Sequence, residues 1–172
     1  TCALPISALT SAQLVYGVAT DISGMSGAQI VALTTSQAAA LTSAQTGALS
    51  TMQLAAIESA DARQLSTSAL QALSTAQIGA LSALAILALS TEQIVLGLGT
   101  DISGLGTTQV NALSTAQVAA LTTDQLAASL GASSAGMGTD QIVALTTAQA
   151  AALTTLQASV LSTAQVAAFE AA

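Results

Sequence analysis

Residues 110–125 read Val-Asn-Ala-Leu-Ser-Thr-Ala-Gln and then Val-Ala-Ala-Leu-Thr-Thr-Asp-Gln, two consecutive copies of one eight-residue unit. We label its positions a to h: a and d are apolar, c is alanine, e and f carry hydroxyl groups, and h is glutamine. The unit continues in one register through all 172 residues. Of the 22 d positions 18 hold Leu, Ile, Met or Phe, and position h holds 14 of the 16 glutamines. Residues 1–172 are therefore predicted to form a single repeat domain of about 21 octads.

The period of eight favours helices over strands. Positions a and d are three residues apart, and d is five residues from the next a. Both spacings are odd, so a continuous strand would send the two apolar positions to opposite faces. Alanine, leucine and glutamine also prefer helical conformation.

The sequence at 121–126 predicts how each helix begins. Thr122 is the expected N-cap, and its hydroxyl accepts from the backbone N–H of Gln125, whose side chain reaches back to the N–H of Thr122. Leu121 and Leu126 flank this capping box as a hydrophobic staple. Each octad therefore predicts a helix of about seven residues, followed by a sharp turn.

Helices this short are marginal alone and must stack. Positions a and d supply the core, and the variable position b is expected to face outward. The predicted fold is all-α, a solenoid of very short capped helices with an eight-residue repeat.

Three octads depart from the pattern, at residues 17–24, 97–104 and 129–136. Their glycines predict loops or sharp corners. The first two contain Thr-Asp-Ile-Ser-Gly, which places Asp21 and Asp101 at position h. A carboxylate beside hydroxyl and backbone oxygens suits calcium, so these two residues are the candidate metal ligands. The alternative is an Asx turn or a helix cap.

The remaining acids favour structural roles. Glu92, Asp124 and Asp140 occupy position g, where the positive end of a helix dipole favours an anion. Asp61 replaces glutamine at position h, and we expect it to serve the same cap.

Composition narrows the function. The formal net charge is −7, with Arg63 as the one basic residue, which disfavours nucleic acid as a partner. Without histidine, and with Cys2 as the only cysteine, the chain lacks the usual groups for nucleophilic triads or zinc sites, so we expect no enzyme. The longest apolar run is 83–89, against about 20 residues for a membrane span. We expect no cofactor except calcium.

The octad resembles the alanine-rich Leu-Thr-Thr-x-Gln repeats of very large secreted bacterial surface proteins, some of RTX or type I-secreted character. The resemblance covers nearly all of the chain and implies a secreted or cell-surface location. It brings no catalytic or binding residues with it.

We therefore expect a structural, self-assembling extracellular protein, a filament, sheath, surface layer or adhesin stalk, whose partner is itself. The repeat runs in phase up to Phe169, which favours a processed chain or one piece of a longer array. The alternative is a binding module that presents the serine and threonine rows at positions e and f to ice or glycan.

Overall fold

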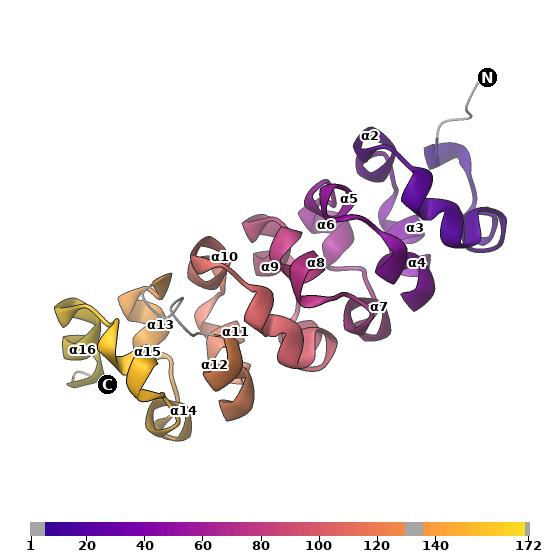
Figure 1. Cartoon of the computed structure of the whole chain (residues 1–172). Coiled ribbons are helices and arrows are strands. Elements are labelled where there is room, and N and C mark those ends of the chain that lie inside the picture. The colour runs from indigo at the N-terminus through magenta and orange to yellow at the C-terminus, as the bar shows by residue number, and fades with distance from the viewer. Residues whose placement is uncertain (1–5, 130–135, 171–172) are drawn as a thin grey trace.

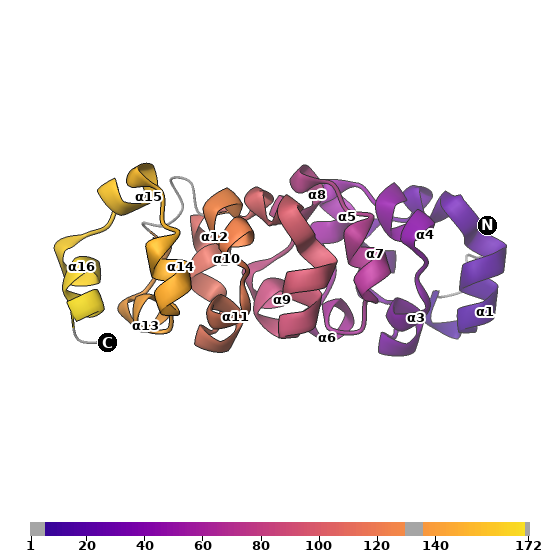
Figure 2. The ribbon, with the colours of Figure 1, turned by 90° about the horizontal axis from the view of Figure 1, so that it is seen from below.

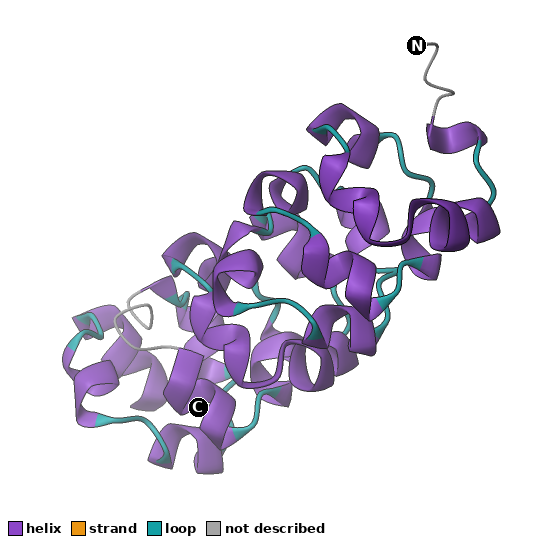
Figure 3. Ribbon diagram, turned by 45° about the vertical axis from the view of Figure 1, so that its right-hand side comes forward, coloured by secondary structure: helices purple, strands orange, loops and turns teal. Residues whose placement is uncertain are grey.

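Short helices follow one another around a common axis and build an elongated body, with the two ends of the chain at opposite tips (Figures 1 and 2). The computed structural model describes residues 6–129 and 136–170. Within those ranges the chain is helix, turn and loop, without a strand (Figure 3). The all-α solenoid expected from the eight-residue period is confirmed.

The N-terminal half contains η1 (Ile6–Ala8), α1 (Ser11–Gln13), η2 (Leu14–Val18), η3 (Ala19–Gly24), α2 (Gly27–Val31), α3 (Thr35–Ala40), α4 (Ser43–Ala48), α5 (Thr51–Ala55), α6 (Ser59–Ala62), α7 (Thr67–Gln71), α8 (Thr75–Ala80) and α9 (Ala83–Ala88). The C-terminal half contains η4 (Gln93–Leu98), η5 (Gly99–Gly104), α10 (Thr107–Ala112), α11 (Thr115–Ala120), α12 (Thr123–Ser129), α13 (Thr139–Val143), α14 (Thr147–Ala151), α15 (Thr155–Ser159) and α16 (Thr163–Glu170). Most of the α-helices have five or six residues, slightly fewer than the seven expected.

The ends of each helix follow from positions d and e. In α11 the N-cap Ser114 is extended, with φ −69° and ψ 158°, and its hydroxyl accepts from the N–H of Gln117. The helix ends when the N–H of Leu121 bonds to the carbonyl of Val118 and ψ of Leu121 opens to 140°. Leu113 and Ser114, the C-cap of α10 and the N-cap of α11, are both extended, and the chain turns at these two residues. The predicted capping box is confirmed where Ser or Thr at position e is followed by Gln at position h, as in α3, α5, α8, α11 and α14. It is absent from α6, α7 and α9, in which position h holds Asp61, Ala69 and Ala85.

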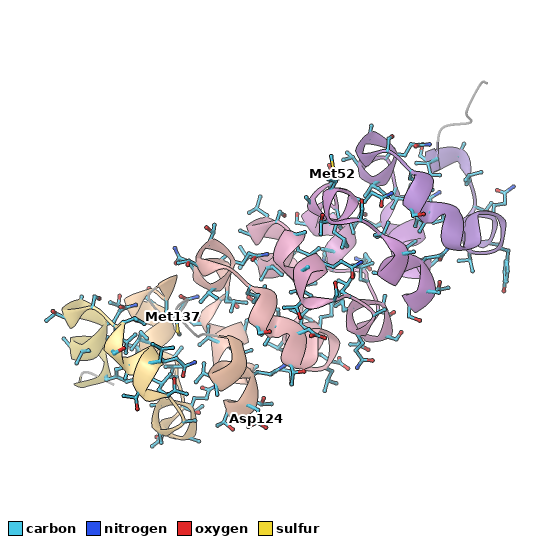
Figure 4. All side chains as sticks on the ribbon, in the orientation of Figure 1. Met52, Asp124 and Met137 are labelled. Atoms are coloured by element: carbon cyan, nitrogen blue, oxygen red, sulfur yellow. The ribbon has the colours of Figure 1, made fainter. Side chains whose placement is uncertain are left out.

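Positions a and d form one continuous core. Every described a side chain from Ile6 to Ile142 is buried, and so are the d side chains of the regular octads from Leu33 to Met137. Position b faces outward as expected: Val31, Leu87 and Val143 are each 46 % exposed. Figure 4 marks the contrast between the exposed Met52 and Asp124 on the outside and the buried Met137.

Helices three octads apart stack on one another. α4 packs on α7, α6 on α9, and α13 on α16, each pair beginning about 24 residues apart. Because neighbours in space are a full turn apart in sequence, no octad is held in place by its own residues alone.

The first two irregular octads are helical, so the expectation of loops is wrong there. The second does contain a sharp corner, at Gly99, whose φ of 52° and ψ of −137° are not helical. A π-helix, η4, runs into the 3₁₀-helix η5 without a new N-cap, and η2 and η3 repeat this arrangement. The glycines allow η4 and η5 to lie close to the preceding turn. A Cβ on Gly97 in η4 would lie 2.9 Å from Cδ1 of Leu70. A Cβ on Gly104 would lie 2.1 Å from the carbonyl oxygen of Thr75. Most of the third irregular octad, 130–135, lies outside the described residues.

Candidate functional site

The side-chain amide of each h-position glutamine occupies the seam between two turns of the solenoid. Oε1 of Gln117 accepts from the backbone N–H of Ser114 at 2.7 Å and closes the cap of its own helix. Nε2 of the same amide donates to the carbonyl oxygens of Leu89 at 2.7 Å and Ile86 at 3.1 Å, in the preceding turn. Gln117 is only 3 % exposed. One side chain thus joins the N-terminus of α11 to the C-terminus of α9.

The same bridge recurs along the described chain. Nε2 reaches the d-position carbonyl 28 residues earlier, at 2.6–2.7 Å, from nine glutamines: Gln37, Gln53, Gln77, Gln93, Gln109, Gln117, Gln141, Gln149 and Gln165. Gln45, Gln125 and Gln157 each lie 28 residues after the first residue of an irregular octad. They bond instead to carbonyls just before that octad, at Leu14, Val95, Leu126 and Ala127, and Gln125 also bonds to Gly99 within it. We call these contacts the glutamine bridges.

The glutamine bridges satisfy both ends of the short helices. A helix leaves backbone N–H groups unpaired at its start and carbonyl groups unpaired at its end, and in helices of six residues these groups are most of the backbone. Buried polar groups are costly unless they are hydrogen-bonded. An amide suits this place because it accepts on one side and donates on the other.

Sequence reasoning found the cap but missed the bridge. Glutamate serves in a capping box as well as glutamine does. Position h nevertheless holds 14 glutamines and no glutamate. That preference was the available signal, because only the amide has a donor to spare for a second helix.

Asp61 does not cap its helix, contrary to expectation. The side chain of the N-cap Glu58 makes no capping bond in α6, and no hydrogen bond reaches the Asp61 carboxyl from the described residues. Asp61 is 4 % exposed. Burial, and then the nearby charge of Glu58, raise the pKa of the Asp61 carboxyl above its ordinary value of 3.8. The carboxyl is one methylene shorter than glutamine, so the same bridge does not form.

The two candidate calcium ligands lie in 3₁₀-helices 80 residues apart. Asp101 is exposed, and its Oδ1 accepts from the hydroxyl of Thr75 in the preceding turn at 2.9 Å. The side chain of Asp21 lies outside the described part of the chain. Calcium binding stays a prediction: millimolar calcium should raise the melting temperature relative to EDTA, and Asp101→Asn should reduce the rise.

The described surface offers little else for chemistry. No three His, Cys, Asp or Glu side chains gather there as metal ligands. A polar depression of about 340 Å³ lies between α10, α11 and α13, lined by Asn111, Ser114, Thr115, Thr139, Asp140 and Gln141 among others. None of the helices in the described ranges is long and apolar enough to cross a bilayer.

Among known protein families, the chain matches one that is defined by the same eight-residue repeat. A family model described as the ALTTAQ repeat matches residues 19–51, 54–91 and 98–128, more than half of the 172 residues. Its name spells positions c to h, which residues 144–149 reproduce as Ala-Leu-Thr-Thr-Ala-Gln. Neither the curated proteins nor the solved structures contain a match to the chain. The expected alanine-rich Leu-Thr-Thr-x-Gln repeat is confirmed.

Proposed function

This chain belongs to the ALTTAQ repeat family, and we propose that it is a structural, self-assembling protein of the extracellular space or cell surface. Filament, sheath, surface layer and adhesin stalk are the forms this role takes. The proposal includes that the chain is not an enzyme.

The observation that carries the proposal is the exposure of the core at the last turn. The d-position leucines Leu113 and Leu121 are 4 % exposed, whereas Leu145, Leu153 and Leu161 are only half-buried. At position a, Val118 is 1 % exposed and Val166 is 47 % exposed. A buried side chain of this size contributes about 1.5–3 kcal/mol relative to an exposed one. Covering the last turn therefore stabilises the solenoid, whether a second copy or further repeats cover it.

The composition supports a durable external material. Charged residues are only 5 % of the chain, so association desolvates few charges, and the repulsion from the net charge of −7 is screened by salt. Arg63 is the only lysine or arginine, which leaves trypsin-like proteases one site. The buried glutamine side chains of the interior form the glutamine bridges, which hold one turn of the solenoid to the next.

Electron microscopy and sedimentation of the purified protein at micromolar concentration test the proposal. We expect filaments or sheets, with the sedimentation coefficient rising with concentration. A monomer at all accessible concentrations would overturn self-assembly.

The exposed threonines at position f support the second candidate, a binding module for ice or glycan. Thr35, Thr51 and Thr115 are exposed, whereas the e-position hydroxyls already accept capping bonds from the backbone. Thermal hysteresis from the soluble monomer, or retention on a glycan array, would favour this candidate over assembly.

A further inference from the structure

The outer surface of α9 is entirely apolar. This helix reads Ala-Leu-Ala-Ile-Leu-Ala, without a polar side chain. Ala85 and Ile86 are buried in the core, whereas Leu84 is 69 % exposed and Leu87 is 46 % exposed. The two leucines are three residues apart, so they lie side by side on one face of the helix.

No other described helix combines large apolar side chains at the two exposed positions, g and b. At these positions most octads hold alanine, serine, threonine or an acid. Isolated exposed leucines are ordinary on a protein surface, whereas apolar side chains gathered on one face are typical of an interaction site. The exposed side of α9 is therefore the strongest candidate for a contact in the middle of the solenoid.

Polar residues border the two leucines. α9 packs against α6 on one side and α10 on the other. Positions g and b hold Ala60 and Arg63 in α6, and Thr108 and Asn111 in α10, and all four residues are exposed. Together with the two leucines they make up what we call the α9 face. An apolar centre with a polar margin that includes arginine is the usual composition of a protein–protein interface.

Two opposite charges at the ends of α6 lack a partner. Glu58 is the N-cap and Arg63 the C-cap of this helix, and both side chains are exposed. Neither side chain has a hydrogen bond or an ion pair with a described residue. Arg63 is the only basic residue of the chain, and the other charged residues are all acids. A second copy of the chain is therefore rich in the charge that Arg63 attracts.

We propose that two copies pair side by side through the α9 face, about a two-fold axis parallel to the solenoid axis. α9 then lies against α9 of the second copy, which buries Leu84 and Leu87 of both. Because the helices follow one another around the solenoid axis, α6 runs across that axis, and the two-fold axis sets it antiparallel to α6 of the second copy. Arg63 of each copy therefore faces Glu58 of the other, so the ion pair forms twice.

This inference rests on the proposed self-assembly and adds a lateral contact to it. The contact is isologous: the same patch serves both copies, and the association closes as a pair. It uses only residues in the middle of the chain. Any other partner would need an apolar strip with an acid and a base at matching places, whereas a second copy has this arrangement by symmetry.

Substitutions at the two leucines test the apolar contact. Leu84→Asp and Leu87→Asp each place a charge in the centre of the α9 face. Each should raise the dissociation constant of the pair about tenfold or more in analytical ultracentrifugation, because a buried charge without a partner is costly. Met52→Asp is the matched control, since Met52 is 83 % exposed at position g of α5, outside the α9 face. It should pair like the wild type, and far-ultraviolet circular dichroism verifies that all three variants are folded.

Charge reversal tests the two-fold axis. Arg63→Glu sets two acids against each other in the pair, and Glu58→Arg sets two bases against each other. Each variant alone should therefore raise the dissociation constant about threefold or more. An equimolar mixture of the two variants should pair as the wild type does, because opposite charges then meet at both contacts.

Unchanged pairing of Leu84→Asp and Leu87→Asp, loss of pairing in Met52→Asp, or a mixture that pairs no better than its components would overturn the α9 contact while self-assembly stands. A wild type that binds phosphatidylcholine vesicles through these leucines, without pairing, would assign the face to a membrane and overturn the contact as well. A wild type that stays monomeric at all accessible concentrations would overturn both the contact and self-assembly.

Discussion

Gln117 and Leu89 lie 28 residues apart in sequence and are joined by a 2.7 Å hydrogen bond from the Gln117 amide to the Leu89 carbonyl. The bond connects the start of one helix to the end of another, one turn of the solenoid below. Because the other side of the same amide closes the helix cap, local and long-range structure depend on one functional group. Stability of a helix is therefore coupled to the presence of the turn beneath it.

Replacing Gln117 by glutamate separates these two roles. Glutamate retains an oxygen for the cap but has no N–H to donate, and its charge faces two carbonyl oxygens in a buried site. We expect Gln117→Glu to lower the free energy of unfolding by about 2–4 kcal/mol at neutral pH, since leaving buried and charged polar groups unsatisfied costs at least this order. Urea denaturation measures the loss, and acidification should reduce it by restoring a proton to donate.

The same change at Gln13 is the control. Gln13 makes the identical cap with Thr10 but is exposed and forms no bridge to a described residue. Gln13→Glu should stay within about 0.5 kcal/mol of the wild type when both are unfolded as dilute monomers. Equal losses at the two positions would show that the bridge contributes nothing beyond the cap.

Adjacent threonines at the start of α12, Thr122 before the helix and Thr123 as its first residue, provide a test of the register. The Thr122 hydroxyl accepts from the N–H of Gln125 at 3.1 Å, whereas Thr123 is exposed and makes no such bond. Thr122→Ala should cost about 0.5–2 kcal/mol, the usual range for losing an N-cap. Thr123→Ala should lower the free energy of unfolding clearly less than Thr122→Ala does. Thermal unfolding of both variants measures the difference. A larger loss at Thr123 would contradict the assignment of the N-cap to position e.

The sequence was sufficient to predict the structural features that arise within a single octad. The cap and the outward position b follow from contacts within about eight residues, and regular octads such as 118–125 contain both. Helix length follows to within one or two residues. The bridge from Gln117 to Leu89 could not be predicted in the same way, because it depends on the number of octads per turn. The role of Asp61 was predicted wrongly for a related reason. A carboxyl can cap a helix, but the burial of Asp61 depends on the neighbouring turn and cannot be predicted from the sequence of its own octad.

Asp61 should oppose stability at neutral pH. Its pKa is raised in the folded state, so the folded protein binds this proton more tightly than the unfolded chain does. The free energy of unfolding therefore falls as the pH rises from about 3.8 through the folded pKa. We expect Asp61→Asn to stabilise the protein by about 1 kcal/mol at pH 7 and by much less at pH 3. Asp61→Gln should gain more, because its amide is long enough to form a bridge.

Asp124→Asn gives the comparison for Asp61. Asp124 is exposed in the first turn of α12, where the helix dipole favours its charge. Neutralising it should leave stability unchanged or slightly lower at pH 7. Denaturation at pH 3 and pH 7 measures all three variants, and a gain in Asp61→Asn that persists undiminished at pH 3 would refute the buried-charge explanation.

Two glycines at the same place in the irregular octads should respond in opposite ways to a methyl group. Gly24 and Gly104 each end a 3₁₀-helix, η3 and η5. A Cβ at Gly104 would lie 2.1 Å from the carbonyl oxygen of Thr75, whereas a Cβ at Gly24 meets no atom within 4 Å. The difference arises because α8 and α12 both pack on η5, whereas of the described elements α4 packs on η3 and no counterpart of α8 does.

Gly104→Ala must therefore push α8 and η5 apart, and such overpacking typically costs about 1–3 kcal/mol. Gly24→Ala has open space and should be neutral or stabilising by about 0.4–1 kcal/mol, since alanine restricts the unfolded chain more than glycine does. Thermal unfolding of the two variants compares them directly. Because the local sequences are nearly the same, intrinsic helix propensity alone would shift both variants equally. A loss confined to Gly104→Ala would locate the constraint in the backbone of the neighbouring turn, and equal shifts would exclude that close approach.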